Sequence, residues 1–415
     1  MHCLRFGQGK CLLWICVATI RRLVIFSLFL FQIFSLFHLV FAFVDGYNEM
    51  VFIQKRSRIM RRDKALFYEK PKRNYTGCLV YPLLILLVLT VIFALNYINS
   101  GRVALKKQDV TIASLSSDLE KYRILHISDL HGKEFGPDQA TIANMLVGSS
   151  YKAVCITGDV CASDGNYDAF IKLIELFPKE IPVFFIAGDE DPDPILTSAH
   201  ATDAVKADYV LAAEAAGAIY LDTPCPITVG KSTIWFCPES VYGLDLVSSR
   251  AAYQARRDQL TNSPDAYHPD VAAQIRAIDY RLSVLDKTES AFREMQPEDA
   301  QIALTHHPLT DETLNLLQQW AGSEGNFLRS VSLLLAGHNN AGQIRLPLVG
   351  ALKAPSSAGG AWFPEDHTMV GLSIVHGITQ YISPGLGVSD DYPIPLRIFN
   401  TPAITIITLT SRLTL

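Results

Sequence analysis

The sequence predicts an α/β domain that follows an apolar N-terminal part. From about Asp109 onward, short and continuously apolar runs alternate with stretches of helical periodicity. Continuous apolar strands separated by helices are typical of a sheet that is covered on both faces. Over the whole chain, 49% of residues are hydrophobic and 19% are charged. This balance is too apolar for a disordered chain and indicates membrane segments in addition to a packed core.

Two N-terminal stretches are long enough to cross a bilayer, which takes about 20 apolar residues. They comprise residues 23–44 and 78–96, and neither contains a formal charge. A buried core helix is the alternative for each stretch, but the lack of a polar face favours transmembrane helices. Basic residues gather between the two stretches, from Lys55 to Arg73. Because basic residues beside a span stay cytoplasmic, we expect a membrane protein whose C-terminal domain is extracytoplasmic.

The predicted organisation has three parts. Residues 1–59 form an N-terminal extension that contains the first apolar stretch, and Met60 is an alternative start of the chain. Residues 60–108 contain the basic segment and the second stretch, which serves as an uncleaved anchor under either start. Residues 109–415 form the main domain, with a charged helical insertion at about 250–297.

Five apolar runs in the main domain are predicted to be buried strands. They are Arg123–Ser128, Ala153–Thr157, Pro182–Ala187, Gln301–Thr305 and Val331–Ala336. Between the second and third runs, Tyr167–Phe177 has the periodicity of an amphipathic helix. The tail from Leu396 to Thr410 is rich in β-forming residues.

Each of these five runs is followed by polar residues. In chain order the clusters contain Asp129 and His131, then Asp159, then Asp189 and Glu190, then His306 and His307, then His338 and Asn340. Open α/β sheets place their sites at the carboxyl ends of strands. Aspartate, histidine and asparagine supply the oxygen and nitrogen ligands of divalent transition metals. Each cluster is common by chance, but their order and strand context together predict one metal site.

With these motifs the sequence resembles the calcineurin-like metallophosphoesterases, and most of all their membrane-associated envelope branch. The matching stretches are ILHISDLHG at 124–132, ITGDV at 156–160, AGDED at 187–191, LTHHP at 304–308, AGHNNAGQIRLP at 336–347, SPGLG at 383–387 and LRIFNTPAITIITL at 396–409. The resemblance covers roughly residues 109–409 apart from the insertion. It implies a four-layer α/β/β/α sandwich that binds divalent metal ions, commonly Mn, Fe or Zn.

The resemblance also implies a role for each motif. The first metal would be held by Asp129 and His131, and Asp159 would bridge two metals. The second metal would be held by Asp159, Asp189, His306 and His338. Metal-activated hydroxide would then hydrolyse a phosphodiester or phosphomonoester, because bound metal lowers the pKa of water and neutralises developing charge. The expected substrate is a phosphorylated small molecule or a lipid at the membrane.

Three positions depart from the family pattern. Asp189 replaces an asparagine ligand, and Glu190 replaces a histidine that assists the leaving group. Glu190 is therefore predicted to be catalytic together with Asp159, which requires a raised pKa of the Glu190 carboxyl. Asn340 replaces a histidine ligand of the first metal and offers a weaker carbonyl oxygen. The alternative is a degenerate member that binds one metal or a phosphorylated ligand with weak or no turnover.

Two further residues near these motifs have two readings each. His307 is expected at the rim of the site, although its imidazole could also substitute for a ligand. Arg345 either meets a phosphate or forms a structural salt bridge. The mild net charge of -5 does not point to nucleic acid, whose binding requires a basic face, so nucleic acid is not an expected partner.

Overall fold

The computed structural model describes residues 76–198, 204–314, 330–392, 394 and 396–411. In the first described helix, the structure describes the side chains of residues 82–91, 93, 94 and 96 only. The chain divides into two compact units, residues 1–82 and 83–415, and the second unit carries the predicted site. The apolar stretch at 23–44 and the basic segment at 55–73 lie outside the described residues.

Helix α2 covers Thr76–Ser100, so the predicted helix over residues 78–96 is confirmed. Its large apolar side chains between residues 83 and 93 are 36–63% exposed. Pro82 lies inside the helix, in its second turn, where a proline has no N–H to donate to the carbonyl four residues earlier. Among the helices of the described residues, none meets the length and hydropathy that crossing a bilayer requires.

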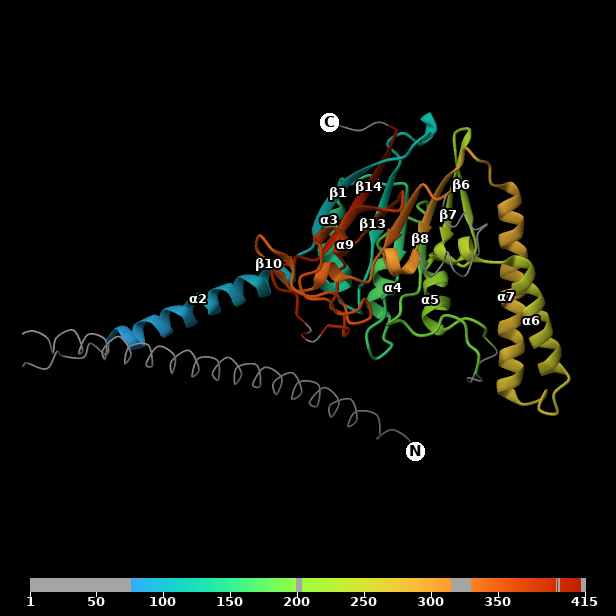
Figure 1. Cartoon of the computed structure of the whole chain (residues 1–415), viewed down its shortest axis with the longest axis horizontal. Coiled ribbons are helices and arrows are strands. Elements are labelled where there is room, and N and C mark those ends of the chain that lie inside the picture. Colours follow the sequence, from blue (N-terminus) through green and yellow to red (C-terminus); the bar gives the residue numbers. More distant parts are fainter. Residues whose placement is uncertain (1–75, 199–203, 315–329, 393, 395, 412–415) are drawn as a thin grey trace, which may run out of the picture. The chain divides into compact units, whose positions relative to one another are not determined.

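Two mixed six-stranded sheets form the main domain (Figure 1). The first sheet has the order β1 (Ala104–Thr111), β14 (Ala403–Thr410), β2 (Arg123–Ile127), β3 (Ala153–Thr157), β4 (Val183–Ile186) and β5 (Ile219–Tyr220). The second sheet has the order β12 (Gly371–Val375), β13 (Ile378–Ile382), β9 (Leu333–Ala336), β8 (Ala300–Leu304), β7 (Ser232–Pro238) and β6 (Cys225–Val229). All five strands predicted from apolar runs are therefore confirmed.

A shared apolar core joins the two sheets. Ile124, Cys155 and Phe184 of the first sheet pack in one cluster with Phe236 and Ile302 of the second. The rings of Phe184 and Phe236 stack with centroids 4.6 Å apart. Strand residues alternate between the two faces of a sheet, so the neighbours of these residues face the other way. The two sheets consequently lie face to face, which is consistent with the predicted sandwich.

Helices α3 (Ala140–Leu146), α4 (Asp168–Glu175) and α5 (Asp208–Ala216) cover the other face of the first sheet. Helix α4 confirms the amphipathic helix predicted at 167–177. It buries Phe170, whose ring meets that of Phe185 edge-on at 5.3 Å. This second core fixes β2, β3 and β4 from behind, so their carboxyl ends are held by packing on both faces.

A helical hairpin packs on the outer face of the second sheet and corresponds to the insertion predicted at about 250–297. It consists of α6 (Leu246–Thr261) and α7 (Pro269–Glu294), which lie side by side in Figure 1. Ala291 and Phe292 of α7 pack against Trp235 and Cys237 of β7. The remaining described strands and α-helices are short: β10 (Arg345–Leu346), β11 (Gly350–Ala351) and α9 (Asp366–Met369).

Candidate metal centre

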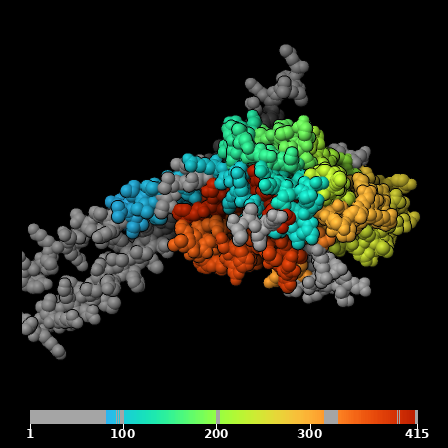
Figure 2. Space-filling view, turned by 90° about the horizontal axis from the view of Figure 1, so that it is seen from above, coloured from blue at the N-terminus to red at the C-terminus, as the bar shows by residue number. Residues whose placement is uncertain are grey.

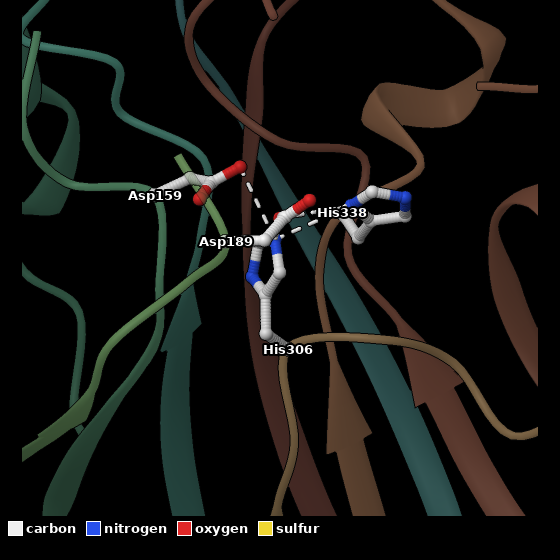
Figure 3. Close-up of side chains that lie close together, drawn as sticks. All are labelled: Asp159, Asp189, His306 and His338. Carbon is white, nitrogen blue, oxygen red and sulfur yellow. Dashed lines mark hydrogen bonds and ion pairs between the residues drawn. The ribbon is translucent and has the colours of Figure 1, made fainter. Parts of the chain in front are cut away.

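Side chains from both sheets meet at the carboxyl ends of the strands. Figure 3 shows Asp159, Asp189, His306 and His338 pointing toward one another from the loops that follow β3, β4, β8 and β9. One donor atom from each of the four lies within 4.8 Å of the others. The structure thus brings together the four residues that the sequence assigned to the second metal.

Short contacts define this four-residue group. His306 Nε2 lies 2.7 Å from Asp189 Oδ1 and 3.1 Å from Asp159 Oδ2. His338 Nδ1 lies 3.3 Å from Asp189 Oδ1. Burial tends to raise the pKa of Asp189, but the hydrogen bonds and charges of the two histidines outweigh it and hold the pKa well below its usual range. Asp189 is therefore a carboxylate, as a metal ligand must be.

Both histidines are oriented by hydrogen bonds on the ring nitrogen that faces away. His306 Nδ1 lies 2.8 Å from the Thr157 carbonyl, which can only accept, so Nδ1 carries the proton. His338 Nε2 lies 2.7 Å from Ser357 Oγ, and the Ser357 hydroxyl donates to Asp391 at 2.5 Å. A divalent cation would displace the protons of His306 Nε2 and His338 Nδ1, and these partners would then leave the lone pairs of both atoms directed at it, an arrangement typical of metal-binding histidines.

A second group shares Asp159 with the first. Donor atoms of Asp129, His131 and Asp159 lie within 4.8 Å of one another. The Asp129 carboxylate accepts the backbone N–H of His338 at 2.8 Å and the Ser128 hydroxyl. Burial raises the pKa of the Asp129 carboxyl. The structure thus places the three residues that the sequence assigned to the first metal beside the four-residue group.

The backbone at these ligands is unusual. Asp129, His131, Asp159, His338 and Asn340 all have positive φ angles, between 47° and 67°. Non-glycine residues rarely adopt this left-handed conformation, and each instance costs about 1–3 kcal/mol. Such strain is found mainly where the surrounding structure holds side chains for a function. The ligand loops are therefore held in place by the packed sheets beneath them.

Gly188 allows the loops after β3 and β4 to approach. A Cβ atom at this position would lie 2.1 Å from Asp159 Oδ1. Asp191 fastens the same two loops, because its carboxylate accepts the N–H groups of Val160 and Cys161 at 2.8 Å and of Gly188 at 2.9 Å. This role of Asp191 was not predicted from the sequence. Its position directly after the ligand motif was the only available signal.

Glu190 contacts the predicted first-metal ligand. Its Oε2 lies 3.1 Å from His131 Nδ1, and its Oε1 accepts the Ser389 hydroxyl. Burial tends to raise the pKa of Glu190, but the hydrogen bond and charge of His131 and the bond from Ser389 hold it below its ordinary value. The predicted acid role requires a raised pKa of Glu190, so the lowered pKa is opposite to that prediction. The geometry instead favours Glu190 as a residue that orients His131.

Asn340 lies between His131 and a buried arginine. Its Nδ2 is 3.3 Å from His131 Nε2, and its Oδ1 accepts a hydrogen bond from Arg397 Nη1 at 3.3 Å. Both side chains are buried. Arg397 follows Asn340 by 57 residues, and no local sequence pattern links the two.

His307 and Arg345 lie at the periphery. The His307 side chain is 52% exposed, and its Nε2 is 3.9 Å from Asp189 Oδ1, which places it at the rim. Arg345 donates to both carboxylate oxygens of Asp366 at 2.6 and 2.8 Å and to the Ala341 carbonyl. Of the two readings of Arg345, the structure shows the salt bridge.

The donor set fits divalent transition metals. Carboxylate oxygens and imidazole nitrogens with lone pairs directed at one point are the ligands that Mn, Fe and Zn take in proteins. Three buried or half-buried aspartates also require a compensating positive charge. Paired carboxylate and imidazole groups at the strand ends of an α/β sandwich define a class of protein, the metal-dependent phosphoesterases.

Comparison with known proteins specifies the family. The sequence pattern of the calcineurin-like phosphoesterases matches residues 122–339, and the chain belongs to this family of hydrolases. Among solved structures, the phosphopantetheinyl hydrolase PptH from Mycobacterium tuberculosis is similar, with 13% identity and a TM-score of 0.32. The likeness covers 64% of this chain and 89% of that one. No curated protein matches the chain.

Proposed function

We propose that the protein is a membrane-anchored, metal-dependent phosphoesterase that hydrolyses a phosphodiester or a phosphomonoester. The observation that carries this proposal is the group of Asp159, Asp189, His306 and His338, whose donor atoms converge within 4.8 Å. A bound divalent ion would supply a Lewis acid for the phosphoryl oxygens and lower the pKa of a water molecule.

The residues of the chain prepare the site before substrate arrives. Thr157 and Ser357 fix the two histidine rings through hydrogen bonds of 2.8 and 2.7 Å. The Glu190 backbone N–H donates to Asp159 Oδ1 at 2.9 Å, which leaves Oδ2 directed at His306. Because these groups are already ordered, little reorganisation accompanies the reaction.

Hydrolysis of a generic aryl phosphodiester and an aryl phosphomonoester tests this function. The full chain in detergent micelles, loaded with Mn²⁺, should be compared with Asp159→Asn. We expect the variant to lose more than about 100-fold in rate, because even partners outside the ligand shell cost 10–100-fold. Asp265→Asn is a matched control, since Asp265 is exposed on the helical hairpin. Equal rates in the wild type and Asp159→Asn would refute the enzyme proposal.

Exposed apolar residues support the membrane part of the proposal. Helix α2 exposes large apolar side chains from Leu83 to Phe93. Asn96 in the same helix donates to the Arg397 carbonyl at 2.6 Å and accepts the Phe399 N–H at 2.9 Å. In the C-terminal part of the domain, orange to red in Figure 2, further large side chains are exposed. These are Leu348, Val349, Trp362, Phe363, Leu396 and Phe399.

Exposed side chains of these kinds suit the interface of a bilayer, where aromatic and aliphatic side chains are favoured. The proposed substrate is accordingly a phosphorylated lipid or a small molecule held near the membrane.

The basic segment at 55–73 supports a cytoplasmic N-terminal part and an extracytoplasmic domain. Protease added to intact cells should digest the domain. Digestion only after the cells are opened would contradict this orientation.

A further inference from the structure

The amide of Asn340 presents its nitrogen, not its oxygen, to the first metal position. Its Nδ2 lies 3.3 Å from His131 Nε2 and 3.4 Å from the His338 carbonyl, while its Oδ1 faces Arg397. A guanidinium offers only N–H donors, so the amide atom that faces it must be the oxygen. If the amide were flipped, its N–H groups would face the N–H groups of Arg397. Two donors that face each other in a buried site are unfavourable.

Arg397 is fixed in this position. It is 2% exposed, and its guanidinium also donates to the carbonyls of Gly387 at 2.7 Å, Asn340 at 3.1 Å and Pro384. Charge-assisted hydrogen bonds of this kind are stronger than neutral ones. The orientation of Asn340 is therefore set by a group that several backbone carbonyls hold.

This orientation affects His131. Its Nδ1 lies 3.1 Å from the Glu190 carboxylate, which accepts, so Nδ1 carries a proton, and in the neutral ring that metal binding requires the lone pair is on Nε2. Asn340 Nδ2 donates to that lone pair. An ion at the first position would have to displace this hydrogen bond. It would also lie one side chain away from the positive charge of Arg397, and like charges repel.

We infer that this centre holds a single metal ion, bound by Asp159, Asp189, His306 and His338, and that Asn340 and Arg397 take the place of the first ion. This inference rests on the metal-dependent function proposed above and departs from the two-metal pattern that the family resemblance implies. Asn340 then acts as a hydrogen-bond donor that faces the site, and Arg397 supplies a permanent positive charge beside Asp129 and Asn340.

Metal counting tests the inference without any measurement of turnover. The full chain in detergent should be loaded with Mn²⁺, freed of excess metal by gel filtration and analysed by elemental mass spectrometry. We expect about one ion per chain. The electron paramagnetic resonance spectrum should be that of an isolated Mn²⁺, because two ions about 3.5–4 Å apart would be magnetically coupled. Two tightly bound, coupled ions in the wild type would overturn the inference.

Ligand variants separate the two positions. His306→Gln should reduce the ion count to near zero, because His306 belongs to the four-residue group. His131→Gln should leave the count at about one. A fall from two ions to one in His131→Gln would instead show an occupied first position.

An isosteric variant tests the role of Asn340 directly. Asn340→Asp keeps an oxygen for Arg397 and turns the second atom from a donor into a metal ligand. We expect the ion count to rise about twofold, with coupled Mn²⁺ in the spectrum. Asn144→Asp, an exposed position on α3, adds the same charge and should stay at one ion. A folded Asn340→Asp variant that still binds one ion contradicts the inference. If the variant does not fold, the number of ions bound by the wild type decides between one occupied position and two.

These results are distinguishable from a failure of the proposed function. One bound ion without hydrolysis would refute the enzyme and leave the single-ion centre in place. Two bound ions with hydrolysis would refute the single-ion centre and support the enzyme.

Discussion

At the scale of single residues, the metal centre depends on side chains that do not contact the metal position. His338 has its outer nitrogen bonded to Ser357, whose hydroxyl is bonded in turn to Asp391. Asp391 also accepts the Ser357 N–H at 3.1 Å, so it fixes both the backbone and the hydroxyl of that serine. The chain of three residues determines which nitrogen of His338 is available as a ligand.

Asp391→Ala should weaken metal binding without unfolding the domain. Loss of the carboxylate frees the Ser357 hydroxyl, and His338 loses its fixed orientation. We expect the dissociation constant for Mn²⁺ to rise about 10–100-fold, as is typical for partners of metal-binding histidines. Isothermal titration calorimetry measures the change. The adjacent and exposed Asp390→Asn serves as the control, and equal affinities in both variants would contradict the role of Asp391.

At the scale of secondary-structure elements, the predictable part of the site was the set of strand ends. An apolar run followed by polar residues is a local pattern, and it located β2, β3, β4, β8 and β9 together with their ligands. Contacts such as Arg397 to Asn340 or Ser357 to Asp391 join residues 57 and 34 positions apart. No periodicity marks such pairs, because they arise only when the two sheets have packed.

The helical hairpin shows which interactions stabilise an inserted element. Ion pairs cross its two helices, and Arg250 lies 2.8 Å from Glu289 and also contacts Asp286. These groups are partly exposed, and such pairs contribute at most about 1 kcal/mol. Leu285 of α7 is 2% exposed, so its apolar side chain is buried in the folded protein. Burial of apolar surface should therefore outweigh the ion pairs.

Two variants of the hairpin compare the contributions of apolar burial and of the ion pairs to stability. Leu285→Ala should lower the free energy of unfolding by about 2–5 kcal/mol, because it removes buried methyl groups and leaves a cavity. Arg250→Ala should lower it by less than about 1 kcal/mol. Denaturant unfolding followed by circular dichroism gives both values. A larger loss in Arg250→Ala than in Leu285→Ala would show that the ion pairs dominate.

At the scale of the whole domain, stability should depend on pH through a histidine inside the sandwich. His126 of β2 is completely buried, its Nε2 lies 2.9 Å from Thr157 Oγ1, and its ring meets Tyr381 of the second sheet edge-on. Burial lowers the pKa of His126 from its ordinary 6.5 to about 3. The folded domain therefore keeps this ring neutral across a pH range in which the unfolded chain protonates it.

Between about pH 6.5 and pH 3 the unfolded state binds more protons at His126, so the free energy of unfolding should fall as the pH falls. His126→Gln removes this contribution. We expect its free energy of unfolding to decline less steeply between pH 6.5 and pH 4.5 than that of the wild type, as measured by urea unfolding at several pH values. Identical slopes would exclude His126 as a source of the pH dependence.

The position of β14 has a consequence for how the protein is made. This strand comes after every other described strand in the chain, yet it lies between β1 and β2, parallel to the first and antiparallel to the second. A ribosome delivers β1 and β2 long before their common neighbour exists. The nascent domain must leave that gap open until residues 403–410 emerge, and contacts of such long sequence separation form slowly. Because β2 leads directly to Asp129, we expect the metal centre to be completed only after the last strand has been inserted.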